Sequence, residues 1–128
     1  MLTLNYKYPY KEIKRKKVNG KRLYETESGA LPSVTTILDK TKPRQKRIAL
    51  ANWKKRVGEK QARKIVTEAA STGTYMHAIL EAWVLNEEYS GESTVQSRMM
   101  AEVVKNNTQA DIDEVWGSEV NLYYPGLY

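Results

Sequence analysis

The sequence lacks several features that define large classes of proteins. It has no cysteine among its 128 residues, which excludes a disulfide framework. No apolar run approaches the roughly 18 residues that span a bilayer, so we expect no membrane insertion. The N-terminus, Met1 to Tyr6, lacks the basic start and the apolar stretch of a signal peptide. We therefore expect a cytoplasmic protein, in the host cytoplasm if the gene belongs to a phage.

Phenylalanine is also absent and histidine occurs once, whereas nine Tyr and three Trp are present. Tyr and Trp combine an apolar ring with a polar group, so they suit a core and an interface equally. A chain of this length forms one small domain. Such a domain buries on the order of two-thirds of its unfolded surface, and the ordinary aliphatic content is not that of a disordered chain.

Acidic residues are scarce in the first half of the chain, and basic residues are scarce in the second. Residues 1–64 hold 19 of the 21 Lys and Arg and 5 acids, whereas residues 65–128 hold 2 bases and 10 acids. One interpretation is an ordinary solvated surface. The other is a basic face for a polyanion beside a separate acidic region. A nuclease needs both, because cations hold phosphates and acids hold metal.

The basic N-terminal region, residues 1–30, indicates a β-hairpin. Asn19-Gly20 lies between two strand-like runs and is a typical hairpin turn, so we expect strands near residues 12–18 and 21–26. Seven of the twelve residues from Lys11 to Arg22 are Lys or Arg. Plain solvation and contact with phosphate are equally good interpretations of this basic run.

The remainder of the chain, residues 31–128, has mostly helical periodicity. Ser33 is a suitable N-cap for a short helix that ends at Lys42-Pro43. Four longer helices are expected after it, over residues 45–57, 59–70, 75–87 and 95–106. Gly58 and the segment Ser71-Thr72-Gly73-Thr74 are interpreted as breaks between helices.

The last segment has a different pattern. Residues 115–124 alternate with period two, with Glu119 on one side and the apolar side chains of Trp116, Val120 and Leu122 on the other. We therefore expect a strand, followed by a turn at Pro125-Gly126. A lone strand cannot satisfy its own backbone hydrogen bonds. Its partner must be another element of this chain or a missing segment, and an open sheet edge also invites self-association.

The single histidine, His77, precedes Glu81 by four residues, so the two side chains share one helical face. Both can ligate a divalent cation, although this spacing more often indicates an ordinary hydrogen-bonded pair. Trp53, Trp83 and Trp116 also allow two interpretations. They can stack on bases, or they can belong to the core. The core is favoured, because Trp83 lies on an apolar helix face.

Three stretches resemble the PD-(D/E)XK exonucleases of the RecB-like group, in particular the mitochondrial genome maintenance exonuclease family and its phage relatives. The stretches are Leu31 to Leu38, Trp53 to Ala70, and Gly73-Thr74 together with His77 and Glu81. The segment from Glu119 to Tyr128 resembles the next segment of that family. The similarity covers residues 23–128, and the ordered set is more specific than any one motif.

The resemblance implies a fold in which helices pack around a central mixed sheet. This chain would then be of the α+β class, with an incomplete α/β-type nuclease core. The implied activity is metal-dependent exonuclease hydrolysis of DNA phosphodiester bonds. His77 would ligate Mg²⁺ or Mn²⁺, and Glu81 and Glu119 would join it as catalytic residues. The implied contacts with DNA are Ser33, Thr35 and Thr36 and the nearby bases Arg44, Lys54 and Arg56. The basic run of the hairpin region adds Arg15, Lys16 and Lys17 as candidate DNA contacts on their charge, not on the resemblance.

The sequence also departs from the family pattern. Family members continue to an Asp on the next strand and then to an acid-x-Lys motif, and neither comes after Tyr128 here. Glu12-Ile13-Lys14 spells the tripeptide but precedes the helix that it should follow, so we interpret it as chance. We therefore expect one truncated nuclease domain, residues 1–128, that binds metal weakly or not at all.

The sequence leaves three functional hypotheses. The first is the N-terminal part of a DNA exonuclease, inactive alone and completed by a second polypeptide that carries the missing residues. The second is a non-catalytic basic DNA-binding module. The third is an interaction protein that regulates a nuclease by mimicking part of it.

Overall fold

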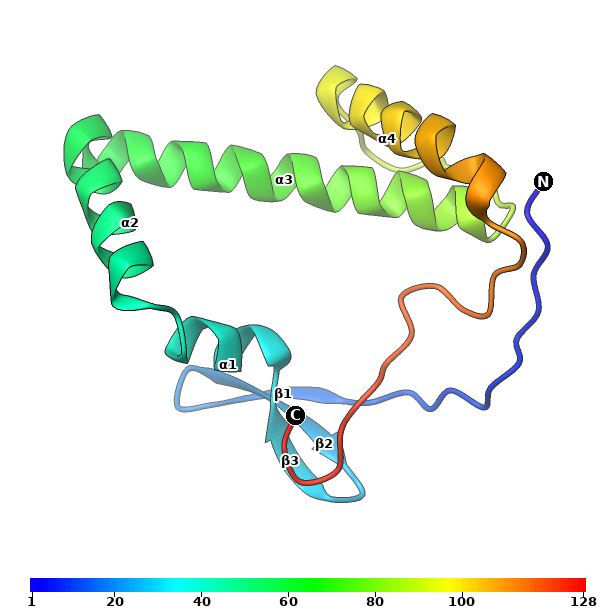
Figure 1. Cartoon of the computed structure of the whole chain (residues 1–128), viewed down its shortest axis with the longest axis horizontal. Coiled ribbons are helices and arrows are strands. Elements are labelled where there is room, and N and C mark those ends of the chain that lie inside the picture. The colour runs from blue at the N-terminus through cyan, green and yellow to red at the C-terminus, as the bar shows by residue number, and fades with distance from the viewer. The chain divides into compact units, whose positions relative to one another are not determined.

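The computed structural model describes residues 1–128 and contains four α-helices, a three-stranded antiparallel sheet and a short 3-10 helix (Figure 1). The α+β class expected from the sequence is confirmed. The chain forms two compact units, which we call unit 1 (residues 1–9 and 57–119) and unit 2 (residues 10–56 and 120–128). None of the helices combines the length and the apolar character needed to cross a membrane.

The sheet of unit 2 consists of β1 (Arg15–Val18), β2 (Lys21–Thr26) and β3 (Gly29–Pro32), in that order. The predicted hairpin is confirmed. Asn19 (φ 52°) and Gly20 (φ 75°) both lie in the left-handed region, as a two-residue hairpin turn that matches the strand twist requires. The third strand was not expected, because it contains glycine and proline, which are poor strand formers.

Two helices follow the sheet in unit 2. Helix α1 (Val34–Lys40) begins after Ser33, whose Oγ accepts a hydrogen bond from the Thr36 N–H at 3.2 Å, so the predicted N-cap is confirmed. Helix α2 (Arg44–Val57) begins after Pro43 and has no buried residue. The Arg47 guanidinium donates to the backbone carbonyls of Asp39 and Lys42, which fixes the connection between the two helices.

Unit 1 is built on α3 (Glu59–Val84), a continuous helix of 26 residues. As the sequence predicted, this helix is separated from α2 at Gly58. The φ angle of Gly58 is 87°, which disfavours any other residue at this position. The predicted break at residues 71–74 is wrong. The Thr74 hydroxyl donates to the Ala70 carbonyl at 2.9 Å, so it bonds within the helix. Gly73 lowers helix stability by only about 1 kcal/mol relative to alanine.

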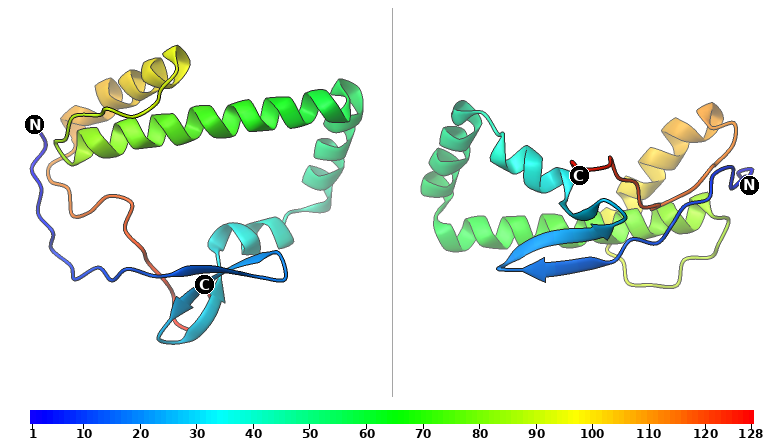
Figure 2. Two further views of the ribbon diagram at one scale, coloured as in Figure 1. Left: turned by 180° about the vertical axis from the view of Figure 1, so that it is seen from behind. Right: turned by 90° about the horizontal axis from the view of Figure 1, so that it is seen from below.

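Helix α4 (Val95–Thr108) lies along the C-terminal half of α3, as both views in Figure 2 show. Its start carries a capping box, in which Thr94 and Ser97 exchange side-chain and backbone hydrogen bonds of 2.8 and 3.0 Å. Ser97 and Ala101 are completely buried. Their small side chains let the two helices approach closely, and this contact forms the core of unit 1. A 3-10 helix (Gln109–Asp111) follows α4.

The predicted strand over residues 115–124 is wrong, and with it the predicted central mixed sheet. Only one residue of this range pairs: Val115 forms a single parallel bridge with Leu4, through hydrogen bonds of 2.8 Å to Thr3 and Asn5. Glu119 adopts a left-handed backbone (φ 52°), which ends the extended run. The strands β1 to β3 pair with one another and leave this segment without a neighbouring strand.

The N-terminal segment is held to unit 1 by side chains as well as by that bridge. The Asn86 side-chain amide bonds both backbone groups of Leu2, at 2.8 and 3.1 Å. Lys7 lies over the Trp116 ring at 4.5 Å from its centroid. The Trp116 indole N–H donates to a Glu114 carboxylate oxygen at 2.6 Å. The hydrogen bonds from Trp116 and Asn5 lower the pKa of Glu114 from its ordinary value.

Candidate functional site

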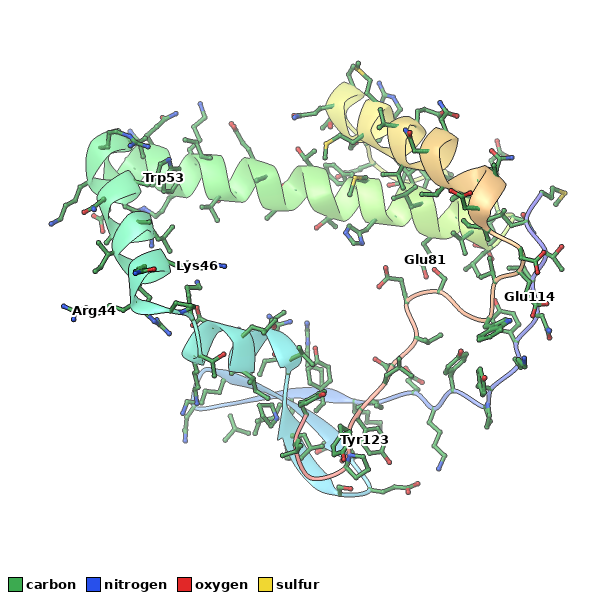
Figure 3. The ribbon with its side chains drawn as sticks, in the orientation of Figure 1. Arg44, Lys46, Trp53, Glu81, Glu114 and Tyr123 are labelled. Carbon is green, nitrogen blue, oxygen red and sulfur yellow. The ribbon has the colours of Figure 1, made fainter.

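The residues predicted to be catalytic lie around one hollow in unit 1. His77 and Glu81 project from the same face of α3, and the loop after Val115 brings Glu119 to them. The His77 Nδ1 atom is 3.7 Å from Glu119 Oε1, and both side chains are more than half exposed. The hollow has a volume of about 590 Å³, and Gly73, Thr74 and Ala78 complete its lining. Glu81 is labelled in Figure 3.

These residues do not form a complete metal site. The structure has no group of three or more His, Cys, Asp or Glu side chains able to hold a metal ion together. Mg²⁺ demands near-octahedral coordination by oxygen atoms, and the hollow offers two carboxylates and an imidazole without bringing them to a common point. The residues present therefore do not fit a resident Mg²⁺ or Mn²⁺ by themselves. No Lys or Arg lines the hollow either, so it offers no permanent positive charge to a phosphate group.

The cationic side chains lie mainly in unit 2, which contains 15 Lys and Arg and 4 acids. Some of these charges are paired within the sheet. Lys16 is 3.2 Å from Glu25 across the hairpin. Arg15 and Lys17 lie on the opposite face of β1 from Lys16, because side chains alternate along a strand. The two of them are therefore better placed than Lys16 to contact a phosphate backbone.

Helix α2 carries the other group of cations. Arg44, Arg47, Lys54 and Lys55 share one side of the helix. Arg47 lies three residues after Arg44, and Lys54 and Lys55 lie seven and eight residues after Arg47, so the four fall within an arc of roughly 100° around the helix axis. We call these four residues the α2 cationic face. Figure 3 shows Arg44 and Lys46 pointing to opposite sides of the helix. Arg56, predicted to bind DNA, also lies off this face by the same geometry.

Arg47 and Lys55 were not among the DNA contacts predicted from the sequence. Their helical spacing from Arg44 and Lys54 was the signal that would have identified them. Arg47 has a second role, since its guanidinium already donates to carbonyls at the end of α1, so Lys54, Lys55 and Arg44 are the freest cations of the α2 cationic face.

The hydroxyl groups predicted to hold the DNA backbone are engaged with one another. Ser33 Oγ lies 3.0 Å from Thr35 Oγ1 and 2.8 Å from Thr36 Oγ1, and it also caps α1. Their local role is therefore to start the helix, and contact with phosphate stays a prediction. Of the tryptophans, Trp53 and Trp83 are half-buried and Trp116 is exposed, so none lies fully within a core.

Comparisons of the chain with protein-family models, with curated proteins and with solved structures found no match. The resemblance to PD-(D/E)XK exonucleases therefore rests on the motifs within residues 23–128 and stays a prediction.

Proposed function

We propose that this chain binds DNA through the cationic side chains of unit 2 and supplies one part of a nuclease site in unit 1, without hydrolysing DNA by itself. The observation that carries this proposal is that His77, Glu81 and Glu119 line one hollow, with the first and last 3.7 Å apart. Glu119 is 42 residues from His77 in the sequence, so their proximity is a product of the fold rather than of local spacing.

The chemistry of phosphodiester hydrolysis explains why the chain alone should be inactive. The reaction needs an activated water molecule and positive charge on the phosphate oxygens. The hollow has an imidazole that can orient the Glu119 carboxylate, but its two acids repel phosphate and no cation offsets them. The missing groups would come from polypeptide other than residues 1–128. The resemblance identifies them as an Asp and an acid-x-Lys motif.

The test has two steps. First, the purified chain is incubated with labelled DNA and Mg²⁺ or Mn²⁺, and we expect salt-sensitive binding without degradation. Second, a polypeptide carrying the Asp and acid-x-Lys segment is added. We expect cleavage that His77→Ala abolishes and that Gln61→Ala, an exposed change on the same helix away from the hollow, leaves intact. Degradation by the chain alone, lost in His77→Ala, contradicts the proposed incompleteness. A pair that stays inactive contradicts the nuclease role.

A second candidate function is a DNA-binding module without any catalytic role. The absence of a metal-holding group favours it. The two candidates differ in metal dependence, which calorimetry with DNA and Mg²⁺ or Mn²⁺ measures. DNA binding that salt weakens and metal does not change favours the module. Failure to bind DNA, with tight binding to a protein, favours a regulatory role instead. A cytoplasmic location stays a prediction under each.

A further inference from the structure

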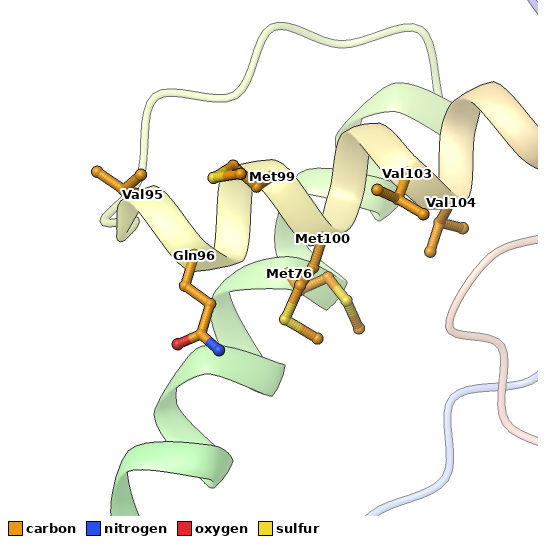
Figure 4. Close-up of a pocket in the computed structure, with 7 residues that line it drawn as sticks. All are labelled: Met76, Val95, Gln96, Met99, Met100, Val103 and Val104. Carbon is orange, nitrogen blue, oxygen red and sulfur yellow. The ribbon is translucent and has the colours of Figure 1, made fainter.

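Helix α4 has a broad apolar surface that α3 covers only in part. The residues on its uncovered side, with Met76 of α3, line an open groove of about 630 Å³ (Figure 4). Three of the four methionines of the chain, Met76, Met99 and Met100, line it. Val95, Met99 and Val103 are each more than 60% exposed. Monomeric proteins seldom expose a contiguous apolar surface of this kind unless it binds something.

The uncovered residues are distinct from those that hold α4 on α3. Ser97 and Ala101 face α3 and are completely buried. Val95, Met99 and Val103 follow one another at intervals of four residues, so they form a stripe on a different side of the helix. We call these three residues the α4 stripe. Its unbranched methionine can adapt its shape to an opposing surface, as a helix-to-helix contact requires.

The charges beside the α4 stripe are complementary to those of a second copy of the same helix. Arg98 and Glu102 border the stripe on the same side and are one helical turn apart. In an antiparallel pair of identical helices, equivalent sides face each other. Arg98 of each copy then lies beside Glu102 of the other. In a parallel pair these sides lie on opposite edges of the contact, and the charges do not meet. We propose that a second copy of this chain packs its α4 antiparallel against the α4 stripe, forming a two-fold symmetric dimer.

The present contacts of the two charged residues do not oppose this arrangement. The Arg98 guanidinium donates to Ser93 Oγ at 2.7 Å, and the Glu102 Oε1 atom is 3.1 Å from Lys105 Nζ. Both contacts are on the surface, where such interactions contribute little to stability, so a rotamer change is sufficient to exchange them. The contact is small, because a helix of 14 residues is about 21 Å long. We therefore expect a dimer that dissociates on dilution in the micromolar range.

The first test is the oligomeric state of the full chain, measured by analytical ultracentrifugation over a dilution series. Met99→Asp places a charge in the centre of the α4 stripe and is expected to give a monomer at every concentration. Its control is Val66→Asp on α3, where a valine that is 55% exposed lies outside the groove. This variant should dimerise like the wild type. Both positions are exposed, so circular dichroism should show unchanged helix content.

The second test reverses the charges. Arg98→Glu and Glu102→Arg, made singly, each bring like charges together at two symmetric positions and should weaken the dimer about tenfold. The double variant restores the opposite pairing and should recover the wild-type dissociation constant. A wild-type chain that stays monomeric at its highest soluble concentration, or a dimer that Met99→Asp leaves unchanged, overturns the proposal. Loss in both single variants without recovery in the double variant overturns the antiparallel arrangement.

Discussion

Removal of two charges from the α2 cationic face tests whether this helix contacts the DNA backbone. The change is Lys54→Gln with Lys55→Gln, which removes two exposed cations and leaves the apolar side chains of the helix in place. Every phosphate contact releases condensed counterions from DNA, so each contributes about −0.9 to the slope of log K against log salt concentration. If both lysines contact phosphate, the slope becomes shallower by about 1.8.

The assay is fluorescence anisotropy of a labelled duplex titrated with protein at several salt concentrations. The matched control is Lys60→Gln with Lys64→Gln on α3, which lowers the net charge by the same amount but lies in unit 1. We expect the control to leave the slope unchanged within experimental error. An equal change in slope for both double variants would mean that net charge alone controls binding. No change in either would mean that α2 does not contact the backbone.

Three further predictions concern stability. Asn86→Gly removes the two hydrogen bonds to Leu2 and should lower the free energy of unfolding by about 2 kcal/mol. Asn86→Ala should lower it by about 1 kcal/mol more, because φ at this position is 57°; equal losses in urea unfolding would refute the backbone argument. Because the pKa of Glu114 is lowered in the fold, its ionised carboxylate stabilises the fold at pH values above the ordinary pKa of 4.5. This stabilisation is lost as the pH falls through the lowered pKa. Glu114→Gln should therefore be less stable than wild type near neutral pH and should lose less stability on acidification, and parallel acid profiles would contradict this. Gly73→Ala should raise the free energy of unfolding by about 1 kcal/mol, because a methyl group there meets no atom within 4 Å; a decrease would mean that the helix is strained at this residue.

Local signals in the sequence were sufficient for much of the fold. Asn19-Gly20 indicated the hairpin, Ser33 the start of α1 and Gly58 the separation of α2 from α3, because each acts through its own backbone or side chain. The missed strand β3 depends on its pairing with β2 instead. Neither Gly29 nor Pro32 favours a strand alone, so nothing in their own segment indicated that partner.

The two wrong predictions have the same physical origin. Residues 71–74 contain good capping residues, but the helix continues because flanking turns and the contact with α4 stabilise it beyond the local preference. Residues 115–124 alternate as a strand does, but a strand forms only beside another strand, and Val115 finds only Leu4. Local pattern therefore identified the residue types without deciding which structure they would form.

In the candidate site, too, local features followed from the sequence and contacts between distant residues did not. The shared helical face of His77 and Glu81 followed from the sequence, because it depends only on their separation of four residues. Only the resemblance indicated that Glu119 belongs with His77, and it placed Glu119 on a strand. In the structure Glu119 lies in a loop, has a left-handed backbone conformation and comes close to His77. The α2 cationic face was only partly identified, since Arg47 and Lys55 were overlooked despite their regular spacing.

Gly73 has a consequence for access to the imidazole. It lies on α3 one turn before His77 and lines the same hollow, and the backbone there is bare on its outer side. In the function proposed above, a side chain at this position would narrow the approach to the imidazole, even as it strengthened the helix. Under that proposal, the stability of α3 and the openness of the approach to His77 place opposite demands on one residue.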